Sequence, residues 1–181
     1  MWISQNTNLQ TFELDELYLF ITRKSRKETQ ENAYIITMIS REPRQIVGFA
    51  AEYDKSAGRI QEIVDNSPPA QMYYTDGYAA YCDVDYFGKH IRNIRDKSDT
   101  YIIESINADL RHYIPGLARR SRCFYRSIET LQAVLSIFID AYNKFGEAKL
   151  KYRVLTNHKS KNPDTHLHKY RELPFSILDF L

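Results

Sequence analysis

The chain has 181 residues, a formal net charge of +2 and a hydrophobic fraction of 43%. This length suits one globular domain with a sizeable core and is short for two. Cys82 and Cys123 lie far apart without metal-ligand spacing, which argues against a disulfide framework or a zinc site and favours a reducing, cytoplasmic location. The start "MWISQNTNLQ" has no signal-peptide pattern, and no window approaches the roughly 20 apolar residues of a membrane span, so no membrane partner is predicted.

The first half of the chain predicts three strands, a short helix and a fourth strand. The β-rich run 11–21 forms the first strand, and runs 31–40 and 44–53 form a hairpin because the proline of "REPR" between them favours a turn. Residues 56–66 carry apolar side chains at helical spacing, with Ser56 as N-cap. The run "QMYYT" that follows predicts the fourth strand.

The second half predicts two helices and an extension. One helix begins near Thr100 and ends at "PG", and the other covers residues 127–142. We therefore expect a main domain over residues 1–146. Residues 147–181 form a basic extension whose apolar end, "LPFSILDFL", is expected to pack back on the protein rather than dock on a second protomer.

Three acidic residues occupy positions that call for an explanation. Asp15 lies inside the apolar first strand, where burying an unpaired carboxylate costs several kcal/mol. Asp76 ends the fourth strand, before a glycine, at the kind of sheet edge that binds ligands. Glu104 is predicted to share a polar stripe with Asn107 and Arg111, away from the apolar face of its helix. Together, the three acids would offer the oxygen ligands that Mg²⁺ or Mn²⁺ prefers.

Each acid also has a simpler interpretation. Asp76 before a glycine is typical of a turn. Asp15, flanked by Glu13 and Glu16, is compatible with a solvated edge strand on which acids prevent aggregation. Glu104 is compatible with an exposed residue in a first helical turn, favoured there by the helix dipole. The combination of the three, rather than any one of them, favours a metal site.

The order of these motifs resembles transposases of the insertion-sequence-one family over about residues 12–143. The resemblance rests on "LDEL", on "TDG" followed by an aromatic residue, on "IIESINADLR", and on "LARRSRCFYRS", where the family has a basic, serine-rich stretch. It implies an α/β fold of the RNase H-like kind, a mixed sheet with an antiparallel hairpin flanked by helices. It assigns catalysis and the binding of Mg²⁺ or Mn²⁺ to Asp15, Asp76 and Glu104. Assisting roles fall on Asn107 and on His90, which is equally compatible with an ordinary surface or core histidine.

The resemblance also implies an activity and partners. The activity is DNA transposition: metal-dependent hydrolysis at transposon ends, followed by strand transfer into target DNA, with the protein associated with the nucleoid when it is bound to double-stranded DNA. A homo-oligomer is implied because two ends react together. The family carries a zinc finger and helix-turn-helix before the catalytic part, and here the first strand comes almost at once. We therefore expect either a frameshift partner that supplies them or their loss.

Two other functions stay open at this point. One is a catalytically idle DNA-binding regulator or inhibitor of transposition from the same family. The other is a cellular RNase H-like nuclease.

A basic segment follows the third acid. Between Leu110 and Ile128 the chain has five arginines and no acid. We expect this segment to contact DNA phosphates, although a solvated helix and loop is the simpler alternative. The five residues are Arg111, Arg119, Arg120, Arg122 and Arg126. Arg111 alone is also compatible with a plain ion pair to Glu104.

Overall fold

The computed structural model describes residues 10–23, 29–93, 100–118, 125–159 and 173–181. The chain divides into two compact units, Met1–Ala133 and Val134–Leu181. Arg119, Arg120 and Arg122 of the predicted DNA surface lie outside the described residues.

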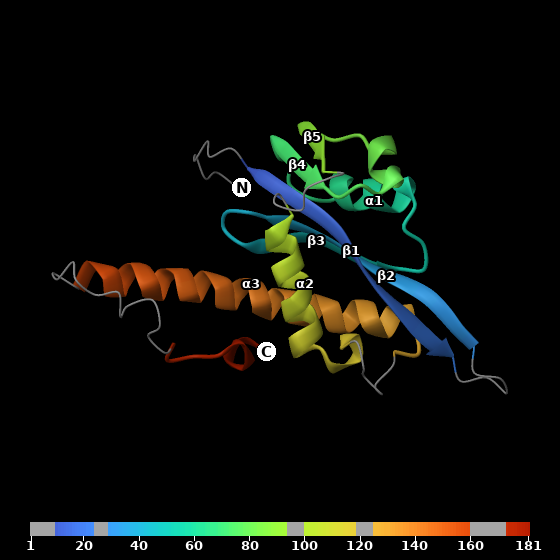
Figure 1. The fold of residues 1–181 in the computed structure, drawn as a ribbon. Helices are drawn as coiled ribbons and strands as arrows, with labels where there is room; N and C mark the ends of the chain where they lie inside the picture. The colour runs from blue at the N-terminus through green and yellow to red at the C-terminus, as the bar shows by residue number, and fades with distance from the viewer. Residues whose placement is uncertain (1–9, 24–28, 94–99, 119–124, 160–172) are drawn as a thin grey trace. The chain divides into compact units, whose positions relative to one another are not determined.

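A mixed sheet of five strands forms the first unit's centre (Figure 1). The strands are β1 (Thr11–Arg23), β2 (Thr29–Ser40), β3 (Gln45–Glu52), β4 (Met72–Thr75) and β5 (Lys89–Arg92). They lie in the order β3-β2-β1-β4-β5; β2 runs antiparallel to β1 and β3, whereas β4 is parallel to β1 and β5. The predicted hairpin is confirmed. The edge-strand interpretation of Asp15 is wrong, because β1 is the central strand.

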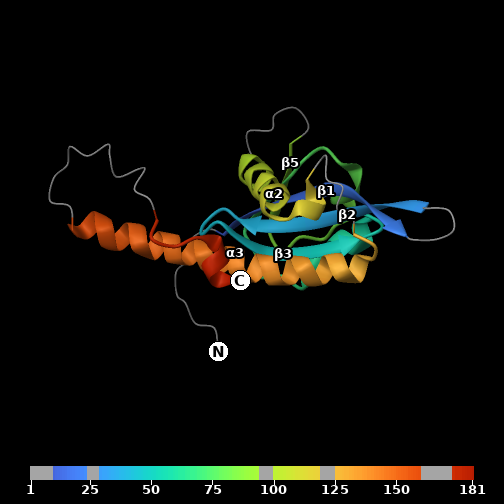
Figure 2. The same ribbon diagram turned by 90° about the horizontal axis from the view of Figure 1, so that it is seen from below.

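The described residues form three α-helices: α1 (Ala57–Asp65), α2 (Tyr101–Tyr113) and α3 (Ile128–Lys159). The short 3₁₀ helices are η1 (Ala79–Asp83), η2 (Pro115–Leu117) and η4 (Ile177–Phe180). Figure 2 shows α2 on one side of the sheet. The strand order, the strand directions and the helices are those of the predicted α/β fold of the RNase H-like kind, which is confirmed.

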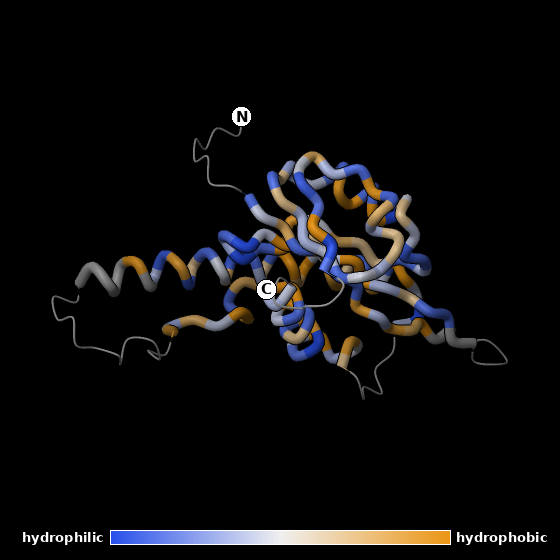
Figure 3. The backbone as a smooth tube through the Cα atoms, turned by 45° about the horizontal axis from the view of Figure 1, so that its top comes forward, coloured by the Kyte–Doolittle hydropathy of each residue, from blue (hydrophilic) through white to orange (hydrophobic). Residues whose placement is uncertain are grey.

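Successive side chains of β1 point to opposite faces of the sheet, and the two faces have different surroundings. Phe12 and Leu14 join a buried hydrophobic cluster with Ile60 and Ile63 of α1, because successive side chains of a strand point to opposite faces. Glu13 and Asp15, which alternate with these residues along β1, therefore face the other side of the sheet, where α2 lies. Figure 3 shows the hydrophobic residues concentrated in the strands and helices.

The structure differs from the sequence-based expectation at two elements. Strand β5 was not expected, because its four residues, "KHIR", show no clear alternation of apolar and polar side chains. Helix α3 continues to Lys159 instead of ending at residue 142. The added turns contain good helix formers and ion pairs four residues apart, Asp140 with Lys144 at 2.6 Å and Glu147 with Lys151 at 4.0 Å.

In the second unit, the apolar C-terminal residues pack against α3. The ring of Phe175 packs edge to face on the rings of Phe145 and Tyr152, with ring centroids 6.0 Å apart in each pair. The ring centroids of Phe180 and Phe145 lie 6.2 Å apart. Within this unit, the C-terminal end therefore packs on α3. Among the described helices, none has the length and apolar character needed to cross a membrane.

Candidate functional site

Asp15 and Asp76 lie on neighbouring parallel strands in matching register. Thr11 of β1 pairs with Met72 of β4, and the pairing continues to Glu13 and Tyr74. The same offset, extended by two residues, sets Asp15 opposite Asp76, which follows the last residue of β4. Two carboxylates from distant parts of the chain therefore meet at one end of the central pair of strands.

Asp15 is partly buried and is held by α2. Asn107 Nδ2 donates a hydrogen bond of 2.8 Å to Asp15 Oδ2, and Thr37 Oγ1 lies 3.5 Å from both Asp15 O and Asn107 Oδ1. Burial raises the pKa of Asp15 from 3.8 to about 6, and the negative charges of Asp76 and Glu104 add to the rise. Hydrogen bonds from the backbone of Glu16 and from Asn107 oppose it. The charges of both other acids therefore act on the carboxylate of Asp15.

The loop that carries Asp76 is held from two sides. Asp76 Oδ1 accepts a hydrogen bond of 2.8 Å from the backbone N–H of Tyr78, so the turn interpretation of this aspartate is correct. Arg92 at the end of β5 donates from Nε to the Gly77 carbonyl at 3.1 Å, and its Nη2 contacts the same oxygen. A role in the turn and a role in binding are compatible, because the turn bond uses only one carboxylate oxygen.

Glu104 lies in the first turn of α2 with an exposed side chain. The predicted polar stripe is only partly correct. Asn107, one turn further along α2, is 8% exposed and reaches into the sheet to Asp15, because a buried amide needs a hydrogen-bond partner. Arg111 lies two turns beyond Glu104 and is partly buried.

His90 lies on β5, opposite Tyr73 of β4. Its Nε2 is 2.8 Å from Thr75 Oγ1, and its ring stacks on Tyr86 with centroids 4.3 Å apart. Burial and the nearby charge of Arg92 lower the pKa of His90, so the ring is neutral at pH 7. These contacts place His90 next to Thr75, the residue that precedes Asp76.

A second buried carboxylate, Glu16, points to the opposite face of the sheet. Its side chain is 5% exposed, and Oε2 lies 3.7 Å from Lys55 Nζ, which also sits 3.9 Å from the centre of the Tyr78 ring. Burial raises the pKa of Glu16. Within the described part of the chain, neither Glu16 Oε1 nor the buried Tyr81 hydroxyl makes a hydrogen bond of normal geometry, although Tyr81 is near enough to lower the pKa of Glu16.

Glu13 is the residue near the site that the sequence-based reasoning missed. In the sequence it stands only as a flank of Asp15, yet in the structure it is completely buried and bonded to Arg41 at 2.6 Å and to the backbone N–H of Ile103 at 2.8 Å. Its distance of two residues from Asp15 was the available signal, since residues two apart on a strand share a face.

Asp15, Asp76 and Glu104 suit a hard divalent cation in donor type and in charge. Carboxylate oxygens are the ligands that Mg²⁺ prefers, and the mutual repulsion seen at Asp15 is the kind that a bound cation relieves. Among the residues that the structure describes, no three His, Cys, Asp or Glu side chains are grouped closely enough to hold an ion. Binding of a cation by all three would therefore require these side chains to come closer together.

Of the predicted DNA-contacting arginines, two lie in the described residues. Arg111 is in the last turn of α2, and Arg126 is exposed just before α3.

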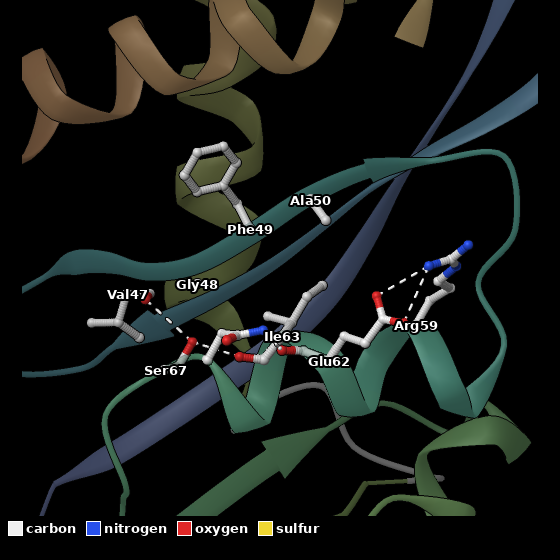
Figure 4. A pocket seen from close by; sticks show the side chains of 9 residues that line it. Val47, Gly48, Phe49, Ala50, Arg59, Glu62, Ile63 and Ser67 are labelled. Atoms are coloured by element: carbon white, nitrogen blue, oxygen red, sulfur yellow. Dashed lines mark hydrogen bonds and ion pairs between the residues drawn. The ribbon is translucent and has the colours of Figure 1, made fainter. Parts of the chain in front are cut away.

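An open pocket of about 310 Å³ lies between β3 and α1 (Figure 4). Val47, Gly48, Ile63 and Ser67 are part of its lining, and Ser67 Oγ donates to the carbonyls of Ile63 and Val47 at 2.7 and 3.3 Å. None of the predicted site residues lines it. This pocket therefore does not belong to the candidate site.

Comparison with known protein families gives one match. A family model described as IS1 transposase matches residues 8–145, a range that contains Asp15, Asp76 and Glu104. A search of curated proteins finds no match.

Proposed function

The chain belongs to the IS1 transposase family, and from this membership we propose that it is a catalytic subunit that cleaves and joins DNA at transposon ends. The observation that carries the proposal is the meeting of Asp15 and Asp76 at the end of β1 and β4, with Glu104 close enough for its charge to act on Asp15. Three acids on a fold of the RNase H-like kind are the arrangement expected for divalent-metal phosphodiester chemistry.

The proposed ligands of Mg²⁺ or Mn²⁺ are Asp15, Asp76 and Glu104. When bound, the metal would lower the pKa of the attacking hydroxyl and stabilise charge on the leaving oxygen. Asp15 and Asp76 supply the fixed part of the site, because each is held by a hydrogen bond of 2.8 Å. Glu104 supplies the third carboxylate, from an exposed position in the first turn of α2.

The other proposed residues position these acids. Asn107 orients Asp15 through Oδ2. His90 holds Thr75, the residue before Asp76, and its lowered pKa keeps it uncharged beside the three acids. A neutral ring at this place adds no positive charge that would compete with a metal for the carboxylates.

Double-stranded DNA, at transposon ends and at the target, is the proposed partner. We assign phosphate contacts to Arg111, Arg119, Arg120, Arg122 and Arg126, supported by the absence of acids from Leu110 to Ile128. Phosphate binding by arginine releases counterions, so affinity for duplex DNA should fall steeply between low and moderate salt. An affinity that stays constant would contradict this assignment. A second protomer and a frameshift partner with a zinc finger and helix-turn-helix complete the proposed assembly.

The test compares the full-length protein with its Asp76→Asn variant on labelled duplex DNA in Mn²⁺ and in Mg²⁺. We expect wild-type protein to cleave the duplex, and Asp76→Asn to bind DNA with unchanged affinity but to cleave at least about a hundredfold more slowly, because one metal ligand is lost. Asp140→Asn is the matched control, since Asp140 is 61% exposed on α3. Full activity of Asp76→Asn would disprove the metal-ligand assignment.

The same assay separates the proposal from its alternatives. DNA binding and Mn²⁺ binding without any cleavage by the wild-type protein would indicate a catalytically idle regulator or inhibitor of transposition. Preferential cleavage of an RNA–DNA hybrid would indicate a cellular nuclease.

A further inference from the structure

We propose that Glu13 is a positioning residue that sets the spacing of Asp15, Asp76 and Glu104 by bonding together the three elements that carry them. The inference rests on the proposed function of these three acids. Glu13 is two residues before Asp15 on β1, on the same face of the strand, and its side chain is completely buried.

The first bond joins β1 to the start of α2. Glu13 Oε2 accepts a hydrogen bond of 2.8 Å from the backbone N–H of Ile103, the residue directly before Glu104. Thr100, at the N-cap of α2, makes no side-chain cap bond. Glu13 accepts from the Ile103 N–H, a buried first-turn group that has no carbonyl partner within the helix, and the helix dipole favours a negative charge at this end. The backbone of Glu104 is thereby fixed relative to β1.

The second bond joins β1 to β4 through Arg41. Glu13 Oε1 accepts from Arg41 Nε at 2.6 Å, and the Arg41 guanidinium carbon lies 4.1 Å from the centre of the Tyr74 ring. Tyr74 is paired with Glu13 in the sheet and precedes Asp76 by two residues. Arg41 is thus held between the strand of Asp15 and the strand of Asp76.

A carboxylate at this buried position accepts two hydrogen bonds that an apolar side chain could not accept. Leucine would fill a similar volume, but it would leave the Ile103 N–H without its acceptor and Arg41 without its ion-pair partner. Two directed bonds fix the distance between β1, α2 and β4 more precisely than apolar packing does. Residues that hold metal ligands in place through hydrogen bonds, without touching the metal, commonly change its affinity. Glu13 does not need to touch the metal or DNA for this role.

The experiment measures two quantities in the full-length protein: Mn²⁺ affinity by titration, and hydrogen exchange of the Ile103 and Glu104 amides by NMR without metal. The variants are Glu13→Gln, which keeps one acceptor oxygen, and Glu13→Leu, which keeps none. We expect Mn²⁺ affinity to fall about tenfold or more in Glu13→Leu and less in Glu13→Gln. Amide exchange at the start of α2 should become faster in the same order, because the Ile103 N–H loses its acceptor on β1. If Glu13→Leu does not fold, Glu13→Gln carries the test through both readouts.

Ile60→Val is the control for a general loss of stability, since Ile60 is buried in α1 on the other face of the sheet. It should lower the melting temperature without changing either readout. Unchanged Mn²⁺ affinity and unchanged amide exchange in both folded Glu13 variants would overturn the inference. Wild-type protein that binds no Mn²⁺ through Asp15 would instead contradict the proposed function, and amide exchange at the start of α2 would then test the bond from Glu13 separately.

Discussion

The side-chain amide of Asn107 lies 2.8 Å from Asp15 Oδ2 and joins helix α2 to the central strand of the sheet. Because this bond favours the ionised carboxylate, it opposes the rise in the pKa of Asp15 that burial causes. Asn107→Ala should therefore raise the pKa of Asp15 further and lower the free energy of unfolding by about 1–3 kcal/mol, the usual effect of losing a hydrogen bond to a charged group. Carboxyl-carbon NMR and urea unfolding measure the two effects. Asn66→Ala is the matched control, since Asn66 is exposed and bonds only the Glu62 carbonyl; an equal response of both variants would contradict the prediction.

Asp15 should make the stability of the metal-free protein depend on pH. Its pKa is about 6 in the folded protein against an ordinary value of 3.8, so folding favours the protonated form. The corresponding stabilisation is complete below about pH 4 and is lost as the pH rises through 6. Asp15→Asn does not ionise, so between pH 4 and 7 it should gain up to about 3 kcal/mol relative to wild type. Urea unfolding with a chelator present tests this, and a difference that is constant with pH would refute it.

The same carboxyl group should make metal binding sensitive to acid. A metal ligand must be deprotonated, so protons compete with Mn²⁺ at Asp15 below about pH 6. We expect the apparent affinity for Mn²⁺ to change little between pH 7 and 8 and to fall by roughly tenfold per pH unit well below 6. Mn²⁺ titrations followed by electron paramagnetic resonance at fixed ionic strength give the profile. An affinity that is flat down to pH 5 would show that Asp15 is not a ligand.

Two buried tyrosines should differ in their response to loss of the hydroxyl group. Tyr81 and Tyr73 are both 0% exposed. The Tyr73 hydroxyl accepts from the backbone N–H of Ala70 at 2.9 Å, so Tyr73→Phe should destabilise the protein by about 1–3 kcal/mol. Within the described residues the Tyr81 hydroxyl makes no hydrogen bond of normal geometry, and it lowers the pKa of Glu16, so Tyr81→Phe should raise the pKa of Glu16 further and change the melting temperature less than Tyr73→Phe does. Thermal unfolding of both variants and carboxyl-carbon NMR of Glu16 measure these effects, and an equal loss of stability in both variants would contradict the assignment of their partners.

Much of the local structure was predictable from the sequence because its causes are local. Alternating β-branched and aromatic residues mark β1 to β4, and apolar residues at helical spacing mark α1 and α2. Strand β5 and the last turns of α3 were not predictable in this way, since their residues show neither period clearly. The motifs around Asp15, Asp76 and Glu104 predicted the family, which the match over residues 8–145 confirms.

The sequence by itself determined β1 to β4, α1, α2 and the first turns of α3, and it identified which acids are candidates for metal binding. Only the tertiary structure decided that β1 is central, that Asp15 and Asp76 share a register, and that Asn107 is buried against Asp15. It also decided that Glu13 is a buried, bonded carboxylate rather than a solvated one. The physical reason is that alternation specifies on which face of a strand a side chain lies, whereas strand neighbours and buried partners depend on contacts between residues far apart in the chain.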